Sequence, residues 1–431
     1  MLDAVIVGGV RTPFVKAGSL FNQIPAQDLG QIVVRELLDR ANVDLAEVDE
    51  LICGNVASPV DAANVGRVIA LRAGIPREKI AHTVSRNCAS GFECVTQAVD
   101  RVTSGRAKCV VAVGVDSMSH IPLFYPKRFA DKLMKLGSAR SVLQKLKAIA
   151  SFRLSDLAPQ IGIKLGLTDP VTGLMMGDTA EKVAREFGIR REEQDQFALR
   201  SHQLAAAAWK ENRLASEVMA FYPETRDAKP LTQDVGFRAD QSLEALQKLK
   251  PYFDRRWGSV TIGNSCQVTD GASALLIMEA NKARELGLTP LGRIRDYAYA
   301  GCDPARMGLG PVFATSRVLQ QAGLKLNDMQ LVELNEAFAA QVLGCLRGFE
   351  SSTFCTSNGC DGSRLGAIDV DRLNVNGGAI ALGHPVGATG TRLILTLLHE
   401  LRRRNLSRGL ATLCIGGGQG GAVVVEALEA S

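Results

Sequence analysis

The segment ELLDRANVDLAEVDELIC, residues 36–53, decides the fold because its pattern recurs in the second half of the chain. The matching segment is RVLQQAGLKLNDMQLVEL, residues 317–334, at a constant offset of 281 positions. Each segment predicts a helix, a turn and a strand. The apolar pairs are Leu38 with Leu319, Val43 with Leu324, Leu45 with Leu326, Val48 with Met329, and Leu51 with Val332.

A second pair of segments extends the repeat. Residues 89–115 (ASGFECVTQAVDRVTSGRAKCVVAVGV) correspond to residues 388–418 (ATGTRLILTLLHELRRRNLSRGLATLCIGGG), and both predict a helix, a basic turn and a buried strand. A unit that occurs only twice indicates a duplicated domain rather than a solenoid. We therefore predict an α/β fold in which two βαβ-rich halves pack as one molecule.

Length and composition agree with two halves. The chain has 431 residues, beyond the roughly 250 to 300 residues that one core usually supports. It is 46% hydrophobic and 22% charged and contains 42 glycines, which is typical of a soluble α/β protein. The net charge of +5 is mild, and no runs of Lys and Arg interleave with aromatic residues, so we expect no nucleic-acid partner.

The sequence favours a cytoplasmic location. The start, MLDAVIVGGVRTPF, reads as a strand rather than as a secretory signal, and no apolar run is long enough for a membrane span. Ten cysteines are scattered without the spacing of a disulfide framework, and several lie in apolar runs, as reduced core cysteines do.

Residues from about 122 to 231 have no counterpart in the second half and predict an insertion. The insertion contains a basic stretch, KRFADKLMKLGSARSVLQKLKAIASFRL (127–154), followed by helical stretches around 178–187 and 191–213. The predicted organisation is a first part of the N-terminal half (1–121), the insertion (122–231), the remainder of the N-terminal half (232–290) and the C-terminal half (291–431).

Four polar or reactive residues lie where predicted elements begin or end. Cys88, in TVSRNCASGFECVTQAV (83–99), separates a strand-like run from an amphipathic helix, and a helix start favours a thiolate. His384 lies in the glycine-rich GGAIALGHPVGATG (377–390), Cys414 ends a buried strand before a glycine loop, and Asn335 follows a strand in LNEAFAAQ (334–341). Because the halves are related, their helix starts should face each other and bring these residues together.

Each residue alone has a more ordinary explanation. A single cysteine is usually inert core, a single histidine is usually satisfied, and an Asn after a strand is usually a helix cap. CTSNGC (355–360) lacks the second Cys/His pair of a zinc site, and GGGQGG is not followed by the GKS or GKT of a phosphate loop. We therefore predict no metal site. The functional interpretation depends on the combination of the four residues.

The motifs together resemble those of thiolases. The resemblance covers nearly the whole chain, from RTPF (11–14) to the last strand. It implies a five-layered α-β-α-β-α core of duplicated βαβαβαββ halves with a mainly helical insertion. The chain looks most like the β-subunit type of the fatty-acid-oxidation trifunctional complex. The motifs are NCASG, GLMMGDTAE (173–181), GSVTIGNSCQVTDGASA (258–274), NEAFAAQ, NVNGGAIALGHPVGATG and CIGGGQGG.

The resemblance implies an acyl-CoA:acetyl-CoA C-acyltransferase that cleaves 3-ketoacyl-CoA, or runs the reverse condensation, through an acyl-cysteine. Cys88 would be the nucleophile, and His384 would hold it as thiolate and help bind the thioester oxygen. Cys414 would be the acid and base. Asn335 would orient a water in one oxyanion hole, and the N–H groups of Cys88 and Gly416 would form another. Such chemistry needs a soft nucleophile, stabilised oxyanions and an acid/base, and no cofactor.

The same resemblance predicts CoA contacts at Met176, Cys266 and Arg238. Cys266 stands where the family often has Ser or Thr, Met175 where it often has His, and Asn335 where the trifunctional β type usually has His. The predicted partners are CoA and acyl-CoA, a second copy in a homodimer or a dimer of dimers, and a hydratase/dehydrogenase subunit.

Several alternatives stay open at this point. A decarboxylating ketoacyl-synthase-like enzyme shares the fold but uses Cys-His-His, against which Cys414 argues. A papain-like hydrolase uses Cys, His and Asn but needs no second reactive cysteine. A scaffold subunit with reduced activity is a third reading. Residues 127–154 predict either a solvated helix that covers the active-site mouth or an amphipathic surface that docks on anionic lipid or on a partner enzyme.

Overall fold

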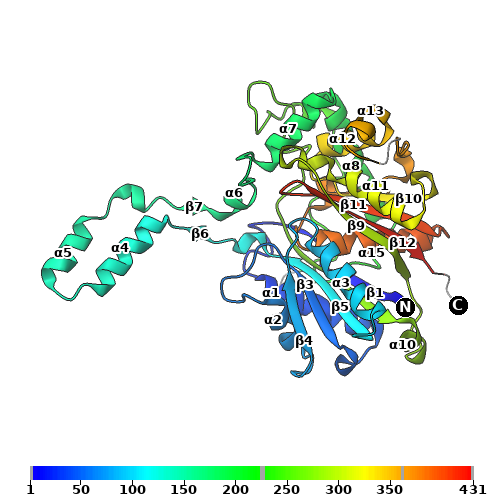
Figure 1. The fold of residues 1–431 in the computed structure, drawn as a ribbon, viewed down its shortest axis with the longest axis horizontal. Coiled ribbons are helices and arrows are strands. Elements are labelled where there is room, and N and C mark those ends of the chain that lie inside the picture. Colours follow the sequence, from blue (N-terminus) through cyan, green and yellow to red (C-terminus); the bar gives the residue numbers. More distant parts are fainter. Residues whose placement is uncertain (1–2, 224–228, 361–363, 429–431) are drawn as a thin grey trace.

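The duplicated segments form two halves of related topology, βαβαβαββ in the first half and the same order without its third strand in the second (Figure 1). The structure, a computed structural model, describes residues 3–223, 229–360 and 364–428. The N-terminal half contains β1 (Ala4–Arg11), α1 (Ala26–Ala41), β3 (Glu50–Gly54), α2 (Val65–Ala73), β4 (Ile80–Val84), α3 (Ser90–Thr103), β5 (Cys109–Asp116) and β8 (Thr269–Glu279). The C-terminal half contains β9 (Gly292–Gly301), α11 (Gly310–Ala322), β10 (Leu331–Leu334), α12 (Ala339–Glu350), α15 (Thr389–Arg403), β11 (Arg408–Ile415) and β12 (Gln419–Ala427).

The two sheets have mirrored strand orders that meet at one edge. The order is β4-β3-β5-β8-β1 in the first half and β9-β12-β11-β10 in the second. β1 and β9 join them through the single antiparallel pair of Ile6 and Gly292. The strand equivalent to β4 is reduced in the second half to an isolated bridge between Val332 and Leu373.

The duplication extends to the way in which a helix ends. Asn42 after α1 and Gly323 after α11 occupy equivalent positions, and both adopt the left-handed conformation, with φ of 51° and 66°. The next residue in each half donates a backbone hydrogen bond to an equivalent carbonyl, Val43 to Leu38 and Leu324 to Leu319. Asn and Gly are the residues that tolerate this left-handed C-terminal cap. The local sequence therefore determines where each half turns back from its helix toward its strand.

Three apolar cores fill the spaces between the layers of helices and sheets. One core lies between α1, α2 and the first sheet, a second contains α3 and α15 between the two sheets, and a third lies between the second sheet and α11 and α12. The layers follow the order α1 and α2, first sheet, α3 and α15, second sheet, α11 and α12, which is the predicted five-layered α-β-α-β-α arrangement. The helices of the central layer carry the residues that matter most for the site.

α3 and α15 approach closely at their first turns because both have glycine there. A Cβ added to Gly390 would lie 2.2 Å from the backbone N of Phe92 and 2.6 Å from the backbone C of Gly91. A Cβ added to Gly91 would lie 2.9 Å from the backbone N of Gly390. The two glycines are equivalent in the repeat, so the halves contact each other through the same residue at the start of the same helix.

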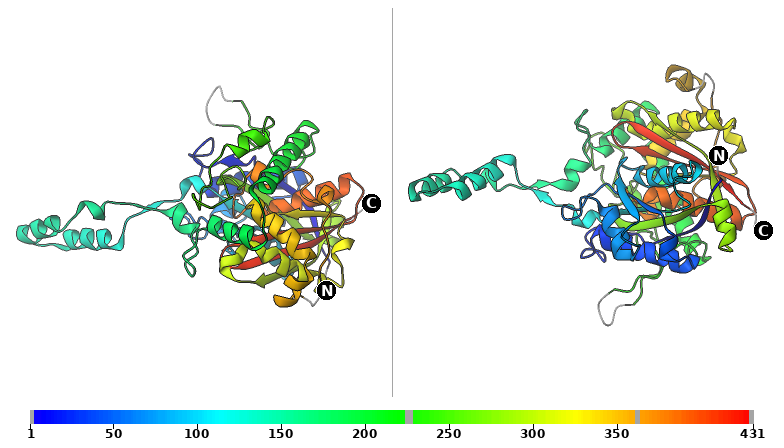
Figure 2. Two further views of the ribbon diagram at one scale, coloured as in Figure 1. Left: turned by 90° about the horizontal axis from the view of Figure 1, so that it is seen from above. Right: turned by 60° about the horizontal axis from the view of Figure 1, so that its bottom comes forward.

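The segment between β5 and β8 contains an arm and a helical cover. The arm projects from the body (Figures 1 and 2) on the two-stranded ribbon of β6 (Leu123–Phe124) and β7 (Gln160–Ile161) and carries α4 (Lys127–Ser138) and α5 (Val142–Ala150). After it come α6 (Gly162–Gly166), α7 (Met176–Glu186), α8 (Arg191–Lys210) and α9 (Leu243–Gln247), and α7 packs against α12 of the second half.

The remaining elements are short. They are β2 (Val15–Lys16), which pairs with β8, and the helices α10 (Ala280–Glu285), α13 (Ser352–Ser357) and α14 (Ala379–Leu382). Across the described ranges 3–223, 229–360 and 364–428, the helices are too short or too polar for any of them to traverse a lipid bilayer.

Candidate active site

Cys88 lies in a tight turn between β4 and α3, just before the helix begins. α3 starts at Ser90 with Ala89 as its N-cap. Asn87 takes the left-handed conformation with φ of 45°, and its Nδ2 donates to the carbonyl oxygen of Gly416 at 2.8 Å. The Cys88 side chain is half-buried. The turn therefore holds the thiol against the glycine loop that follows β11.

Two backbone amides interact with the Cys88 thiol, its own and that of Gly416. Both lower the pKa of the thiol, but burial outweighs them and, together with the nearby Asp116, leaves the pKa above its ordinary value. The sequence-based expectation that the helix start leaves Cys88 as a thiolate is therefore wrong for the resting site. The thiol needs a proton acceptor before it can act as a nucleophile.

His384 is held in the tautomer that can accept a proton. Its Nδ1 lies 2.6 Å from Oγ1 of Thr389, and that hydroxyl donates to the carbonyl oxygen of Pro385 at 2.9 Å. A hydroxyl that donates elsewhere accepts from Nδ1–H, so Nε2 carries the lone pair. Nε2 is buried and has no hydrogen-bond partner among the described residues.

The environment also keeps His384 uncharged. Burial, and to a lesser degree the charge of Arg392, lower the pKa of His384 to about 4. The backbone N of His384 donates to Thr269 Oγ1 at 3.1 Å, which ties this turn to β8 of the other half. Gly383 before it has φ of +106°, and a Cβ there would lie 2.5 Å from Thr269 Oγ1, so only glycine allows this approach.

Cys414 and Cys266 lie close enough to Cys88 to interact electrostatically with it. Burial raises the pKa of Cys414 well above its ordinary value, and negative charge on Cys88 would raise it further. Burial likewise raises the pKa of Cys266 to about 12, with Cys88 again contributing. The backbone N of Cys266 donates to the Ala337 carbonyl at 3.0 Å, beside the segment that carries Asn335. The three sulfurs, from three segments, therefore lie within electrostatic range of one another.

Asn335 follows β10 and has a buried side chain with an unused amide. Its backbone N donates to the Thr412 carbonyl at 3.0 Å. Within the described part of the chain, neither Oδ1 nor Nδ2 has a hydrogen-bond partner, although the residue is only 1% exposed. The neighbouring Glu336, in contrast, accepts from Ser201 Oγ at 2.6 Å and Asn374 Nδ2 at 2.8 Å, so it serves the fold. A buried amide with both ends free is suited to a ligand or a water.

The predicted CoA contacts lie around this group. Met176, the first residue of α7, approaches Gly416, since its Sδ would be 3.4 Å from a Cβ added there. The side chain of Arg238 is exposed, and its backbone N donates to His202 Nδ1 at 3.2 Å. The nearby Gly236 packs against the carbonyl of Ala381, so this segment lies beside the chain that leads to His384.

Sequence reasoning missed Thr389 and Asp116. Thr389 is the first residue of α15, and a hydroxyl residue shortly after a glycine-rich histidine turn was an available signal. Asp116 ends the buried strand β5, and the rule that drew attention to Asn335 and Cys414, a polar residue at a strand end, applied equally to it.

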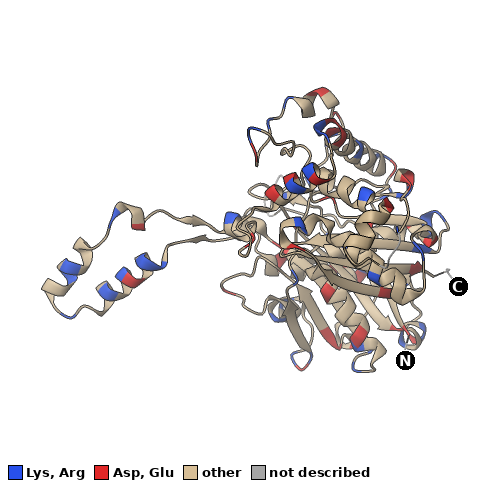
Figure 3. Ribbon diagram, turned by 45° about the horizontal axis from the view of Figure 1, so that its top comes forward, with Lys and Arg blue, Asp and Glu red and all other residues tan. Residues whose placement is uncertain are grey.

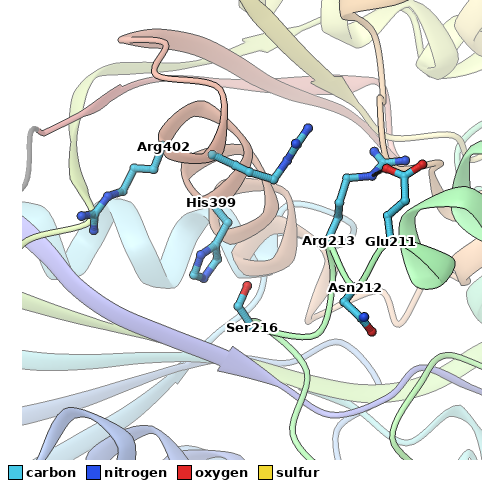
Figure 4. A pocket seen from close by; sticks show the side chains of 7 residues that line it. Glu211, Asn212, Arg213, Ser216, His399 and Arg402 are labelled. Carbon is cyan, nitrogen blue, oxygen red and sulfur yellow. Dashed lines mark ion pairs between the residues drawn. The ribbon is translucent and has the colours of Figure 1, made fainter.

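A groove at the opposite end of α15 is a separate feature. It has a volume of about 450 Å³ and is lined by Glu211, Asn212, Arg213, Ser216, His399, Arg402 and Arg403 (Figure 4). Arg213 pairs with Glu211 at 3.0 Å, and Arg403 pairs with Glu400 at 2.6 Å. The side chain of Arg402 points away from the Arg213–Glu211 pair (Figure 4). The groove contains none of the predicted site residues.

Among the residues that the structure describes, no three His, Cys, Asp or Glu side chains form a group that could hold a metal ion. Cys355 and Cys360 of CTSNGC are both buried as free thiols.

The chain matches two family models, "Thiolase, N-terminal domain" over residues 4–281 and "Thiolase, C-terminal domain" over residues 288–427. It is 44% identical over 424 residues to proteins named 3-ketoacyl-CoA thiolase from Yersinia pestis and Yersinia pseudotuberculosis, covering 98% of this chain and 96% of each relative. Among solved structures, it resembles a Bacillus anthracis acetyl-CoA acetyltransferase, with a TM-score of 0.87, 35% identity and 99% of each chain covered. Human mitochondrial 3-ketoacyl-CoA thiolase in complex with CoA gives a TM-score of 0.85 and 36% identity, covering 99% of this chain and 98% of that one.

Proposed function

Because the chain belongs to the thiolase family, we propose that it cleaves 3-ketoacyl-CoA with CoA to give acetyl-CoA and a shortened acyl-CoA. The family and the enzyme class inferred from the sequence are thereby confirmed. The observation that best supports the site is the hydrogen bond from Asn87 Nδ2 to the Gly416 carbonyl oxygen at 2.8 Å, which holds the Cys88 turn against the loop after β11. The backbone amides of Cys88 and Gly416 lower the pKa of the Cys88 thiol, and Cys414 lies within electrostatic range of it. The ketoacyl-synthase alternative is disfavoured by that second cysteine.

In the first half-reaction, Cys88 transfers its proton to His384 Nε2, and its sulfur attacks C3 of the substrate. The C2–C3 bond then breaks, and Cys414 donates its thiol proton to C2 of the departing acetyl-CoA. Acyl-Cys88 remains, with Cys414 as thiolate and His384 protonated. Negative charge that develops on the substrate oxygens is stabilised by the N–H groups of Cys88 and Gly416 and by a water that the free amide of Asn335 orients.

In the second half-reaction, Cys414 removes the thiol proton of CoA, and the CoA sulfur attacks the acyl carbon. Cys88 leaves as thiolate and recovers its proton from His384. The low pKa of His384 favours this return, since the protonated imidazole is costly in its buried setting. The two half-reactions together require only groups of this protein and CoA as the second substrate.

The direct test of the proposed function is Cys88→Ala. The variant should lose thiolysis of 3-ketoacyl-CoA, and in the native protein Cys88 should be the first cysteine that iodoacetamide alkylates. Cys53, which is fully buried, provides the control: Cys53→Ala should keep thiolysis. Turnover that persists in Cys88→Ala, with another cysteine alkylated first, would overturn the assignment. Kinetics over a series of acyl chain lengths then defines the substrate range.

The CoA contacts, the location and the assembly are part of the same proposal. Met176, Cys266 and Arg238 contact the pantetheine and adenine ends of CoA. All ten cysteines are unpaired, which fits the reducing cytoplasm. A homodimer or dimer of dimers is supported by β4, a sheet-edge strand on which Ile80 is 62% exposed. Size-exclusion chromatography with mass measurement tests the oligomer.

The arm formed by residues 123–161 is the second part of the proposal. It projects away from the body in each view (Figures 1 and 2), which favours a docking surface over a cover for the active-site mouth. Its helices carry mainly Lys and Arg among their charged residues (Figure 3). Its exposed apolar side chains include Val142, Leu143, Leu146 and Ile149, which are 56–75% exposed. This amphipathic surface suits docking on anionic lipid, with a hydratase/dehydrogenase subunit as the competing partner.

Sedimentation with anionic vesicles tests the arm. Lys135, Lys145 and Lys147 are exposed and make no ion pair within the described chain, whereas Lys132 pairs with Asp156 at 2.6 Å and is left intact. Changing the three lysines to Gln should abolish binding at low salt. The matched control changes Lys108, Lys210 and Lys325 on the body to Gln and should bind normally. Equal binding by both triple variants, or capture by the partner enzyme alone, would refute lipid docking.

A further inference from the structure

Asp116 joins the two halves beside the candidate active site. It is the fully buried last residue of β5. Its Oδ1 accepts from Asn55 Nδ2 at 2.8 Å and from the backbone N–H groups of Val56 at 3.0 Å and Ala57 at 2.8 Å. Its Oδ2 accepts from the backbone N of Gly387 at 2.6 Å. One carboxylate therefore links the loop after β3 to the turn that carries His384.

The Gly387 backbone sits tightly on the N-terminal half. A Cβ added to Gly387 would lie 2.8 Å from the Val115 carbonyl oxygen and 2.9 Å from that of Gly54. A Cβ added to Gly114 would lie 2.3 Å from the Gly387 carbonyl oxygen. The His384 turn therefore packs against the carboxyl ends of β3 and β5, and the Asp116 carboxylate accepts a charge-assisted hydrogen bond at this contact.

The position of Gly387 makes that hydrogen bond relevant to catalysis. Gly387 comes three residues after His384 and two before Thr389, whose hydroxyl holds Nδ1 of the histidine. A shift of Gly387 would move both ends of the His384–Thr389 pair relative to Cys88. Displacements of about 1 Å between reacting groups typically cost up to about 100-fold in rate.

We propose that Asp116 is a positioning residue, whose carboxylate fixes the His384 turn of one half against the Cys88 turn of the other. This inference rests on the proposed thiolase reaction. Asp116 acts through Gly387 and touches neither substrate nor the transferred proton.

A pH dependence follows from the same arrangement. Burial raises the pKa of Asp116 to about 6, against the opposing effect of the Ala57, Val56 and Gly387 N–H groups. Protonation below about pH 6 therefore weakens the bond to Gly387, and kcat should fall there. His384, with its pKa of about 4, remains neutral through this range. Its protonation would produce a separate acid limb of the pH–rate profile, near pH 4.

Within the described residues, the titratable groups Cys53, Cys88 and Asp270 interact electrostatically with Asp116. Both thiols have raised pKa values and stay neutral near pH 6. Burial also raises the pKa of Asp270, which accepts from the backbone N of Ser119 at 2.9 Å. Asp270 is therefore the group that must be separated from Asp116 by experiment.

The experiment compares Asp116→Asn, Asp270→Asn and Asp49→Asn in the full-length protein. Asp49 is the matched control, because it accepts from the backbone N of Lys108 at 2.8 Å at the other end of β5. Asp116→Asn should lower kcat about 10- to 100-fold, the loss expected for one charge-assisted hydrogen bond, with little change in KM. Its acid limb should move from about pH 6 toward pH 4. Asp49→Asn should keep both the rate and the limb, and Asp270→Asn should keep a limb near pH 6.

The alkylation rate of Cys88 separates positioning from general damage. Removing the Asp116 charge should leave alkylation by iodoacetamide equal or faster, because that charge raises the pKa of the thiol. An unchanged kcat in Asp116→Asn, or a limb that stays near pH 6, would overturn the proposal. If that variant does not fold, the wild-type profile still decides, since an acid limb near pH 4 in the folded enzyme refutes it. Failure of the proposed function itself shows differently, as turnover in Cys88→Ala.

Discussion

Arg11 and Asp234 form a bidentate ion pair in the interior, with Nη1 to Oδ1 at 2.6 Å and Nη2 to Oδ2 at 2.8 Å. The Nε of Arg11 also contacts Glu217 Oε1 at 2.7 Å, and none of the three side chains is more than 1% exposed. The pair ties β1 to the segments that follow α8. A buried charge of this kind is stable only while its partners are present.

Arg11→Met should therefore destabilise the protein by about 3–5 kcal/mol, because Asp234 and Glu217 would be left buried without a counter-ion. The control is Arg72→Met, since Arg72 pairs with Asp28 where both side chains are at least 40% exposed. An exposed pair contributes at most about 1 kcal/mol. Denaturant unfolding measures both, and equal midpoints for the two variants would contradict the prediction.

Thr389→Val tests the tautomer of His384. Valine removes the hydroxyl that accepts from Nδ1–H and keeps the shape, so the imidazole is free to place its proton on Nε2. The loss of one hydrogen bond predicts a fall in kcat of about tenfold. Thr396→Val is the control on the same helix, because Thr396 Oγ1 contacts Glu217 instead, at 3.1 Å. Steady-state thiolysis compares them, and a Thr389→Val enzyme with native kcat would remove the argument for a fixed tautomer.

Cys414→Ala should separate acyl transfer from proton transfer to carbon. The variant keeps Cys88 and should still form an acyl-enzyme from acyl-CoA, detectable by mass spectrometry. Exchange of the α-protons of acetyl-CoA with deuterium should fall about 10²- to 10⁴-fold, as expected when a general acid/base is removed. Cys345→Ala is the control, because Cys345 also lies near Cys414 but donates to the Gly308 carbonyl within the fold. Exchange at the native rate in Cys414→Ala would assign the proton transfer to another group.

The duplication predicts the two halves and the common edge at which the helices after Cys88 and His384 begin, whereas the roles of the site residues come from the resemblance to thiolases. Equivalent helices start at the same edge of the molecule, so Cys88 before α3 and His384 before α15 could be placed together without coordinates. The sequence pattern marks Thr389 and Asp116 as candidates, but the roles of both depend on hydrogen-bond partners that the pattern does not identify. The bond from Gly387 to Asp116 spans 271 positions, and no local signal reports it.

The pKa of Cys88 shows where local reasoning ends. A helix start argues for a lowered pKa, but the amount of burial depends on how α3, the glycine loop after β11 and Cys266 pack together. That packing raises the pKa of Cys88 instead of lowering it.

The arm shows the same limit of local reasoning. The basic pattern of residues 127–154 predicts amphipathic helices but cannot tell whether these helices lie on the body or project from it. The domain limits and the subfamily remain predictions.

The contact between Gly91 and Gly390 gives the last prediction. A methyl group on Gly390 would approach the backbone N of Phe92 to 2.2 Å, and backbone cannot move aside as a flexible side chain can. Gly390→Ala should therefore force α3 and α15 apart, destabilise the protein by about 1–3 kcal/mol and lower thiolysis, because the turns of Cys88 and His384 precede these helices.

The matched control for this change is Gly137→Ala in α4, where an added Cβ meets nothing within 4 Å. Alanine is the better helix former by up to about 1 kcal/mol, so this variant should lose no stability. Thermal unfolding and thiolysis are measured for both proteins. A Gly390→Ala enzyme as stable and as active as Gly137→Ala would show that the two halves are not held at this glycine contact.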